Sequence, residues 1–482
     1  MRTEIYIGGA WHKGHGEAFA SYDPATGDKV WEGHGANEDD VAEAMAAARL
    51  AFPAWSRRSL EERIAIVRAF AKEIEKCSDE IARTISREMG KVTWDAKGEV
   101  AAMIGKIEIS IRAQAERAGT REEKAAFGAM TLSHHAHGVL GVFGPFNFPG
   151  HLPNGHIVPA LLAGNCVLFK PSEVTPGVGA LMMEAWEAAG LPAGVLNLLQ
   201  GGRETGAALL DSHGLNGVLF TGSAHTGALI HKKFAGRPDV ILALELGGNN
   251  PLIVWPPVDA KAAANLIVHS AFATSGQRCS CARRLIVPQG AEGDAIIAAL
   301  AELTPQISVG PATQTPEPFL GPLVNAHSAE RAVKFEQGLV AMGGKPIVPV
   351  KRDGAYVHPA IIDVTGLTPP DEELFGPVLQ VYRAPDFDHA LDLANATRFG
   401  LAGGLISDDP ALWARVKNEM RAGVLNWIRP TTGASGAMPF GGPGLSGSLL
   451  PSAYYAADYV AFPVATQLSE KAVAIAAPGL PQ

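Results

Sequence analysis

The sequence predicts an α/β fold with a mostly parallel sheet. Short apolar runs appear from about residue 138 onward, and helix-length segments at 175–189 and 203–210 lie between them; the runs are 138–143, 166–169, 195–199, 218–220 and 240–244. Strands and helices that alternate at this interval build βαβ units. The runs are apolar throughout, which is typical of strands with helices on both faces. The region is therefore Rossmann-like, although the common G-x-G-x-x-G fingerprint is absent.

The residues before this region are expected to form an extended arm followed by helices. Ser59 and Glu62 have the spacing of a capping box. Apolar residues then recur at helical spacing on one face, namely Leu60, Ile64, Val67, Ala71 and Ile74. Segments 39–52 and 95–118 are rich in Ala, Glu and Lys and predict two further helices.

A second α/β run follows the first. It begins with an apolar segment at 251–255, continues through a helix expected at 259–275, and extends to about residue 447. Its closing segment, FGGPGLSG at 440–447, predicts a turn-rich loop. The aromatic, strand-like segment beyond it, at 454–462, is expected to pack against either its own chain or a partner subunit.

Composition excludes several function classes. The chain has 482 residues, of which 47% are hydrophobic, and a net charge of −9. About three globular domains are expected at this length, and nucleic acid is not expected as a partner. No apolar stretch reaches the roughly 18 residues of a membrane span, and the N-terminus lacks the apolar core of a signal peptide. We therefore expect a cytoplasmic protein that binds no membrane.

Four cysteines are too few for a disulfide framework. Cys279 stands in the segment GQRCSC beside Arg278, Arg283 and Arg284, and positive neighbours are expected to lower a thiol pKa and favour the reactive thiolate. Cys77, in a polar helix, and Cys166, in a strand, are interpreted as small buried residues. Cys279 and Cys281 lack the further ligands that a metal site needs, so no metal is predicted.

Two other segments contain residues suited to catalysis. Glu245 ends an apolar run and precedes two glycines, which places it at the carboxyl edge of the sheet, where open α/β sheets bind ligands. Partial burial there would raise its pKa and make it a usable base. Asn147 lies in the rigid segment FGPFNFP, and its amide could donate to an oxyanion. Each residue could instead satisfy a local turn.

Two segments could contact a nucleotide. Lys170 and Glu173 follow the strand at 166–169 and could bind ribose hydroxyls. The segment FTGSAHTG at 220–227 leads into a helix, whose N-terminus could accept a phosphate. Neither segment is specific by itself, because glycine turns and surface Lys–Glu pairs are common.

Together and in this order, these segments resemble the aldehyde dehydrogenase superfamily. The matching motifs extend over nearly the whole chain: FNFP at 146–149, KPSE at 170–173, FTGSAHTG at 220–227, ELGG at 245–248, GQRC at 276–279, EELFGP at 372–377, NWIRP at 426–430 and PFGG at 439–442. The resemblance implies an enzyme that oxidises a small-molecule aldehyde.

The resemblance also implies roles for particular residues. Cys279 corresponds to the nucleophile, Glu245 to the general base, and Asn147 to the side-chain half of the oxyanion hole. The remaining implied contacts are to the cofactor: Lys170, Glu173 and Glu373 to the riboses, Phe375 beside the nicotinamide ribose, Ser223 to the pyrophosphate, and Gly222, Ala224, His225, Thr226 and Gly227 in the same segment. Glu173 would repel a 2′-phosphate, so NAD is expected rather than NADP.

The chain departs from the superfamily pattern at two points. His156 stands where a lysine is common, and SGSLLPS after the glycine-rich loop lacks the usual glutamate, which gives Glu245 more weight as the base. Four long segments resemble a narrower group within the superfamily whose aldehyde carries carboxylates, namely 143–165, 242–254, 276–285 and 451–459. Such a substrate needs fixed cations, and Arg278 is one candidate, although it could instead lower the Cys279 pKa or pair with an acidic neighbour.

Three alternatives remain open from the sequence. The substrate could be another anionic aldehyde such as succinate semialdehyde. A thiol, as in CoA-acylating relatives, could replace water, although Glu245 argues against this. The chain could also be a non-catalytic structural or binding protein, which the combination of Cys279, Glu245 and Asn147 disfavours.

The resemblance implies a division into three parts. Residues 1–118 and 137–246 are expected to form the NAD-binding domain, and 247–447 the catalytic domain. Residues 119–136 and 448–482 are expected to form a small β element for oligomerisation, with an arm near 122–136 and a strand near 459–466. A homodimer or homotetramer is therefore expected.

Overall fold

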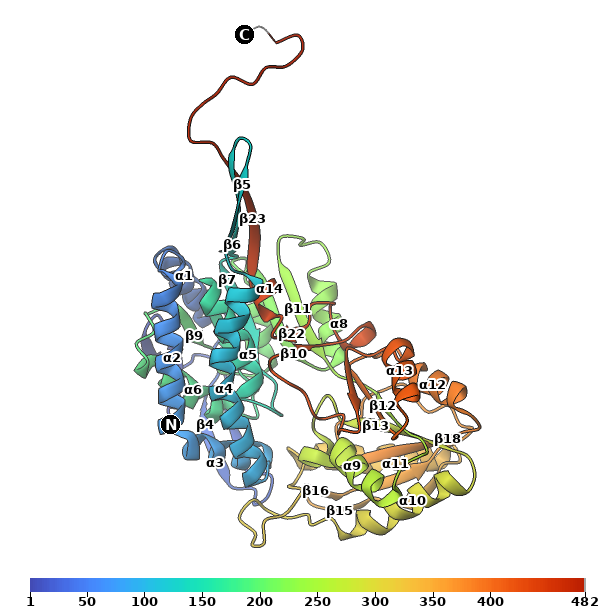
Figure 1. Cartoon of the computed structure of the whole chain (residues 1–482). Helices are drawn as coiled ribbons and strands as arrows, with labels where there is room; N and C mark the ends of the chain where they lie inside the picture. The colour runs from blue at the N-terminus through green and yellow to red at the C-terminus, as the bar shows by residue number, and fades with distance from the viewer. Residues whose placement is uncertain (481–482) are drawn as a thin grey trace.

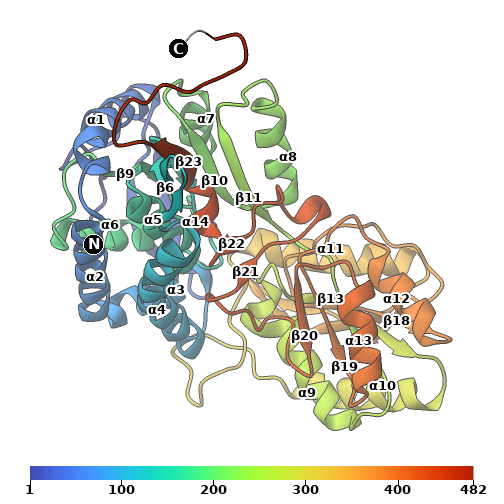
Figure 2. The same ribbon diagram turned by 45° about the horizontal axis from the view of Figure 1, so that its top comes forward.

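The computed structural model describes residues 1–480. It has two lobes, each built on a seven-stranded sheet, and a three-stranded sheet that projects from the first lobe (Figure 1). The colour order shows that the first lobe is formed mainly by the N-terminal half of the chain and the second mainly by the C-terminal half. Residues 469–480 run outward from the projecting sheet as an extended tail (Figures 1 and 2).

The first sheet contains all five strands that the apolar runs predict. Its strand order is β11-β10-β7-β8-β9-β1-β2. The first five of these strands are parallel, and β1 pairs antiparallel with β9 and β2. Their bounds are β1 Ile5–Ile7, β2 Ala10–His12, β7 Val139–Phe143, β8 Cys166–Lys170, β9 Leu196–Leu198, β10 Gly217–Gly222 and β11 Ile241–Leu246. The extended arm expected at the N-terminus therefore includes two strands of this sheet.

Helices cover both faces of the first sheet. The capping box predicted at Ser59 and Glu62 is present at the start of α2, and Val67 and Ile74 are buried as the spacing predicts. Phe70 on the same helix stacks on Trp186 at 3.8 Å. The helices of this lobe are α1 Glu38–Ser56, α2 Leu60–Lys76, α3 Ser78–Met89, α4 Thr93–Arg117, α5 His151–Ala163, α6 Pro176–Ala188, α7 Arg203–Asp211 and α8 Ala224–Lys233.

Two of these helices, α3 and α5, are not among the helices that the sequence predicts. Cys77 lies between α2 and α3 rather than within one polar helix, and its backbone N–H bonds back to the end of α2. The helix α5 is buried almost all round, so it has no polar stripe to reveal its period. Its Pro153, Gly155 and Pro159 further obscure the helical pattern.

The second lobe repeats the parallel arrangement. Its strand order is β14-β17-β18-β13-β12-β19-β20, and only β14 is antiparallel to its neighbour. The strands are β12 Asn250–Val254, β13 Ala282–Pro288, β14 Lys345–Val348, β17 Ala360–Asp363, β18 Val378–Ala384, β19 Ala402–Ile406 and β20 Val424–Trp427. The helices are α9 Ala260–Phe272, followed by the 3-10 turn η1 Ala273–Gly276, then α10 Ala291–Leu303, η2 Thr304–Gln306, α11 Ala326–Ala341, α12 Phe387–Asn395 and α13 Pro410–Glu419.

The projecting sheet joins two distant parts of the chain. The hairpin of β5 (Arg121–Ala125) and β6 (Gly128–Ala136) pairs antiparallel with β23 (Ala461–Leu468). The C-terminal strand is thus covered by its own chain on one edge. Large apolar side chains remain exposed on this sheet and its turn, namely Phe127, Met130, Phe462 and Leu468.

Short elements complete the chain. They are the strand pairs β3 Ala18–Tyr22 with β4 Lys29–His34, β15 Lys351–Asp353 with β16 Tyr356–His358, and β21 Pro439–Phe440 with β22 Ser452–Ala453, the 3-10 turn η3 Gly444–Ser446, and the helix α14 Ala456–Tyr459. Within residues 1–480, every helix is too short or too polar to cross a membrane.

Candidate active site

The parallel pairing brings the predicted site residues of the first lobe to one edge. Strands β7, β8, β10 and β11 all run in the same direction, so their carboxyl ends meet. Asn147 follows β7, Lys170 ends β8, Ser223 follows β10, and Glu245 lies at the end of β11. Cys279 comes from the second lobe, on the loop between η1 and β13.

A left-handed turn precedes Cys279. Thr274, Ser275 and Gly276 have φ of 54°, 55° and 73°, a conformation that costs side-chain-bearing residues free energy. The Thr274 hydroxyl donates to Asp95 at 2.5 Å, and the Ser275 hydroxyl donates to the carbonyl of Gly321 at 2.6 Å. These bonds between segments far apart in the sequence hold the turn that presents the cysteine.

Only glycine fits at position 276. A Cβ there would lie 2.3 Å from the carbonyl oxygen of Gly376, closer than real Cβ contacts allow. The absence of a side chain at Gly276 lets the segment just before β18 pack against the loop that carries Cys279. The glycine of the GQRC segment is therefore required by both its φ and its neighbour.

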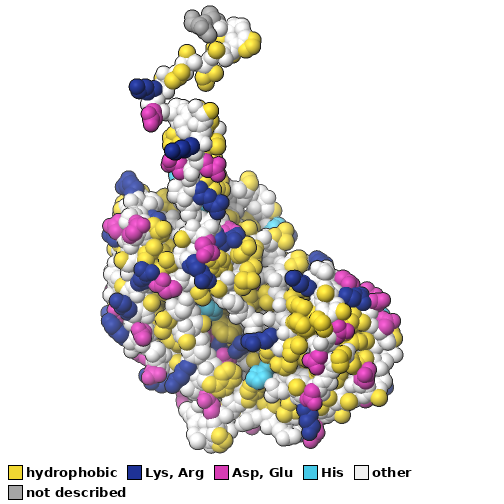
Figure 3. All heavy atoms as spheres, in the orientation of Figure 1, with side chains coloured by type: hydrophobic (Ala, Val, Ile, Leu, Met, Phe, Trp, Pro, Cys, Tyr) yellow, Lys and Arg dark blue, Asp and Glu magenta, His cyan; other side chains and the backbone are white. Residues whose placement is uncertain are grey.

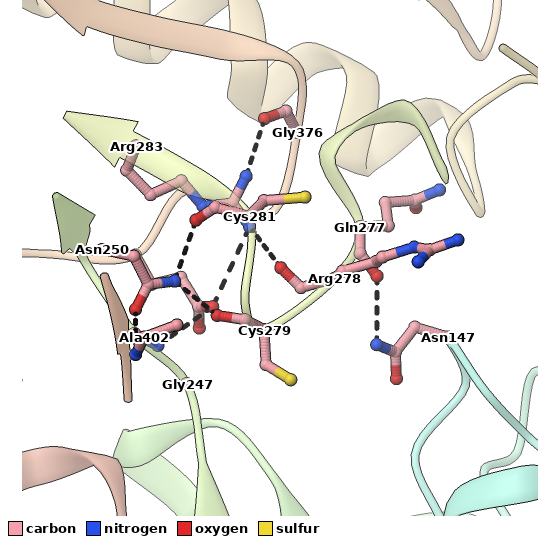
Figure 4. A network of polar contacts seen from close by, with 12 residues as sticks. Asn147, Gly247, Asn250, Gln277, Arg278, Cys279, Cys281, Arg283, Gly376 and Ala402 are labelled. Atoms are coloured by element: carbon pink, nitrogen blue, oxygen red, sulfur yellow. Dashed lines mark hydrogen bonds and ion pairs between the residues drawn. The ribbon is translucent and has the colours of Figure 1, made fainter. Parts of the chain in front are cut away.

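Side chains also hold the backbone on both sides of Cys279. The Asn250 amide donates to the carbonyls of Cys279 and Cys281 at 2.7 and 2.8 Å (Figure 4). Arg283 donates to the carbonyl of Arg278 at 3.0 Å. Asn250 has no role among the sequence predictions, and Arg283 appears there only as a positive neighbour of Cys279. Their only signal was their position beside the ELGG and GQRC motifs.

Asn147 lies beside the nucleophile loop. Its Nδ2 donates to the carbonyl of Gln277 at 3.0 Å, and Figure 4 shows the Cys279 thiol on the side of the loop that faces it. Asn147 is buried. An amide nitrogen has two N–H groups, so one remains for a second acceptor.

The expectation that the Cys279 pKa is lowered is wrong for this structure, although Arg283, one of the predicted positive neighbours, acts in that direction. Burial, followed by the negative charges of Glu245 and Glu373, raises the pKa of the Cys279 thiol well above 9.0, and only Arg283 opposes this. Arg278 is paired with Asp95, with an Nη2 to Oδ1 distance of 2.8 Å. The thiol therefore needs a base or a bound cationic group to ionise.

Glu245 has the environment of a base. It is buried, and within residues 1–480 the one donor near its carboxylate is the Cys279 thiol, which lowers its pKa slightly but is not within hydrogen-bond geometry. Burial, with a smaller contribution from the charge of Glu373, raises its pKa to about 8. The expectation that burial raises this pKa is thus confirmed, and near neutrality Glu245 is mostly protonated.

Glu373 lies against the glycines that follow Glu245. It accepts from the backbone N–H of Gly248 at 3.2 Å, and Arg283 lies 3.9 Å away. Burial raises the pKa of Glu373 to about 7. A Cβ at Gly247 would lie 1.8 Å from the carboxylate, so that glycine makes room for it. Phe375 packs edge-on against Phe146, beside Asn147.

Cys279 lines a cavity of about 390 Å³. Its walls come from α4, α5, the cysteine loop and the segment 432–436. Figure 3 shows the hollow between the lobes, where basic, histidine and apolar side chains gather. Arg278 lines it, but Arg278 is bonded to Asp95 and Thr274, so the alternative of pairing with an acidic neighbour is the one observed.

His156 is held in the cavity wall. Its Nδ1 lies 2.9 Å from the Tyr459 hydroxyl and its Nε2 lies 3.1 Å from the Thr221 hydroxyl. Burial, with the positive charge of Lys106, lowers the pKa of His156 to about 4. The ring is therefore neutral near pH 7, and it links α14 to β10.

The edge of the first sheet fits a dinucleotide. Ser223 caps α8 by accepting from the backbone N–H of Thr226 at 3.2 Å, so this helix presents its N-terminus at the sheet edge. Gly227 lets α8 approach β11, since a Cβ there would lie 2.5 Å from Leu246. Lys170 is buried and lies 3.8 Å from the exposed carboxylate of Glu173. These donors and acceptors match a phosphate group and ribose hydroxyls.

The comparisons with known proteins identify the family. The aldehyde dehydrogenase family model matches residues 11–458, so the chain belongs to that family. The N-succinylglutamate 5-semialdehyde dehydrogenase 2 of Caulobacter vibrioides is 56% identical over 97% of this chain and 96% of its own.

A second relative and a solved structure agree with this placement. The N-succinylglutamate 5-semialdehyde dehydrogenase of Paraburkholderia xenovorans is 52% identical over 96% of each chain. The crystal structure of 1-pyrroline-5-carboxylate dehydrogenase from Thermus with bound NAD has a TM-score of 0.90 and 31% identity, covering 96% of this chain and 92% of that one. The predicted superfamily and its α/β fold are thus confirmed.

Proposed function

We propose that this enzyme oxidises N-succinylglutamate 5-semialdehyde to N-succinylglutamate with NAD, a step of arginine catabolism by the succinyltransferase route. The observation that carries this proposal is the 52–56% identity, over nearly full length, to two enzymes named for that substrate. The narrower resemblance in the sequence points to the same group.

The proposed chemistry begins at Cys279. The thiol ionises before it attacks, because the thiolate is the reactive form, and its proton passes to solvent. The thiolate attacks the aldehyde carbon, and the oxyanion accepts from the Cys279 backbone N–H and the free N–H of Asn147. NAD, when bound, accepts the hydride that leaves this carbon. A thioester on Cys279 results.

Water completes the reaction. Glu245, ionised, removes a proton from water, and the hydroxide attacks the thioester and releases the carboxylate product and the thiolate. A second cavity reaches Glu245 and is lined by the glycine-rich segment 439–451. In the sequence this segment lacks the glutamate that is common in the superfamily, so Glu245 is the base we assign to this step.

The preference for NAD rests on charge. We assign Lys170, Glu173 and Glu373 to the ribose hydroxyls, Phe375 to the nicotinamide side, and the segment 222–227 to the pyrophosphate. Glu173 is 56% exposed at its side chain and carries a carboxylate at the sheet edge, where it would repel a 2′-phosphate. NADP should therefore bind much more weakly than NAD.

We also assign larger roles to the parts of the chain. Residues 1–118 and 137–246 are proposed to bind NAD, 247–447 to supply the nucleophile, and 119–136 with 448–482 to join subunits. The exposed apolar side chains of the projecting sheet support the last assignment. The four cysteines are free, in keeping with the reducing cytoplasm that we propose as the location.

A substrate panel tests the proposed function. NADH absorbance would be followed with N-succinylglutamate semialdehyde, succinate semialdehyde and hexanal, each with NAD and with NADP. We expect the highest kcat/KM for the succinylated aldehyde with NAD. Equal or higher kcat/KM for succinate semialdehyde would move the assignment to another anionic aldehyde. NADH formation only in the presence of free CoA would indicate an acylating enzyme.

A further inference from the structure

Lys106 is a buried cation in the wall of the substrate cavity. It lies on α4, one helical turn beyond Ala102, and lines the same cavity as Cys279. Its side chain is 2% exposed, and its Nζ has no hydrogen-bond partner. It runs along α5 at Gly155, where a Cβ would lie 3.9 Å from Lys106 Cε. Figure 1 shows the two helices side by side.

The acidic residues near Lys106 on its own helix are already paired. Asp95 is bonded to Arg278, and Glu99 is bonded to Lys91 at 2.7 Å with both side chains fully buried. Glu99 also accepts from the backbone N–H groups of Gly150 and His151 at the start of α5. Neither carboxylate is therefore free to balance the charge of Lys106.

The groups that face Lys106 from other elements supply no negative charge. His151 and His156 face it from α5, and burial together with its positive charge lowers the pKa of each to about 4. Tyr459, from α14, donates or accepts only at His156, and burial raises its pKa far above neutrality. The cysteine loop contributes Arg278, a second cation. Burial alone accounts for the lowered pKa of Lys106, to about 8.

An unpaired buried ammonium is costly, and a buried charge is normally paired or hydrogen-bonded. Leucine or methionine would fill this space between α4 and α5 without that cost. Of the two cations that line the cavity within residues 1–480, Arg278 is neutralised and Lys106 is not. The cavity therefore offers one free positive charge to whatever enters it.

We propose that Lys106 is a specificity-determining residue that binds a carboxylate of the aldehyde substrate. This inference rests on the proposed function, because an uncharged aldehyde would leave the ammonium unpaired. With pKa about 8, Lys106 is mostly charged near neutrality, and a bound carboxylate would stabilise the charged form. The role that the sequence analysis offered to Arg278 thus passes to a lysine on α4.

The test replaces Lys106 by methionine and compares two aldehydes. For Lys106→Met we expect kcat/KM for N-succinylglutamate semialdehyde to fall by about 100-fold, mainly through KM, the effect of losing one partner of a buried charge pair. For hexanal we expect a change of less than about threefold. Lys97, exposed on the same helix, supplies the control, and Lys97→Met should change neither value.

Several outcomes would overturn the inference. Equal losses for both aldehydes would show that Lys106 has only a structural role, and an unchanged KM for the succinylated aldehyde would show that it contacts no carboxylate. If wild type fails to prefer the succinylated aldehyde, the proposed function fails. In that case, the kcat/KM loss of Lys106→Met is compared for succinate semialdehyde and hexanal, and a loss for succinate semialdehyde alone would still support a carboxylate contact at Lys106.

A second measurement compares wild type with Lys106→Met. We expect the product N-succinylglutamate to bind wild type, measured calorimetrically with NADH present, at least tenfold more weakly at pH 9.5 than at pH 6.5, as Lys106 loses its proton. Lys106→Met should lose most of this difference; a difference that persists in the variant would come from Glu245 and Glu373, which titrate in the same range, and would contradict the proposal. Affinity for N-succinylglutamate that does not change with pH would contradict the proposal.

Discussion

At the residue scale, the positive charge nearest to Cys279 in the sequence is bound to another residue and does not lower the pKa of the thiol below its ordinary value. Arg278 is adjacent in sequence to Cys279 but is bonded to Asp95. The lowered thiol pKa that this adjacency predicts is therefore not what the structure has. Asp95 lies 184 positions before Cys279, and no local pattern connects them. The motifs predict which residues react, whereas the pairing of charges depends on how distant segments pack.

The pH dependence follows from Glu245. The base is the ionised carboxylate and its pKa is about 8, so the deacylation rate should rise as pH increases through about 8. Stopped-flow and steady-state NADH formation between pH 6 and 10 would measure it. A deacylation rate that has already levelled off by pH 6 would mean that Glu245 is not the base.

Glu245→Gln should separate the two halves of the reaction. We expect one burst of NADH per active site followed by a stall at the acyl-enzyme, because water is no longer activated. Mass spectrometry of the stalled protein should detect the acyl group on Cys279. Loss of the burst itself would place Glu245 in thiol activation instead.

The same substitution should affect stability with a predictable sign. The folded-state pKa of Glu245, about 8, is above its ordinary value of 4.5, so the folded protein holds a proton that the unfolded chain loses. Stability from this group therefore falls as pH rises from about 4.5 to 8. Glu245→Gln should raise Tm at pH 8 more than at pH 5. The reverse order in thermal scans would contradict this.

Asn147→Ala tests the oxyanion hole. Removing one oxyanion donor typically costs about 100- to 1,000-fold in rate, and we expect kcat to fall by at least ~100-fold. The single-turnover burst rate is the measurement. Near-wild-type turnover would remove Asn147 from the chemistry and leave it only its bond to Gln277.

At the element scale, the strands were more predictable than the helices that surround the cavity. The apolar runs at 138–143 and 218–220 correspond to β7 and β10 because buried parallel strands have no polar positions. The buried α5 lacks a polar stripe and was missed. Lys106 was missed for a related reason, since a lysine in a helix rich in Ala, Glu and Lys gives no sign that another helix covers it.

The left-handed turn before Cys279 can be tested by a matched pair of glycine variants. Gly276→Ala should lower Tm and activity, since φ is 73° and Gly376 leaves no room for a Cβ. Gly105→Ala on α4, where a Cβ meets nothing within 4 Å, should stabilise by about 0.5–1 kcal/mol. If both variants melt alike, the turn is not the constraint that we describe.

At the scale of the whole molecule, the resemblance covers nearly the entire chain, and the family and fold follow from it. The oligomer does not follow in the same way, because it depends on which surfaces of two copies meet. The projecting sheet exposes Phe462 and Met130 at 60% and 39%. Light scattering should give the mass of a dimer or tetramer, and Phe462→Glu should lower it. A monomeric wild type would contradict the proposed role of this sheet.

The central claim is that Cys279 carries the reaction, and Cys279→Ala tests it most directly. The variant would be assayed for NADH formation with N-succinylglutamate semialdehyde, while NAD binding is measured by calorimetry. We predict unchanged NAD affinity and no NADH, not even a single-turnover burst. Aldehyde oxidation at the wild-type rate would contradict the account.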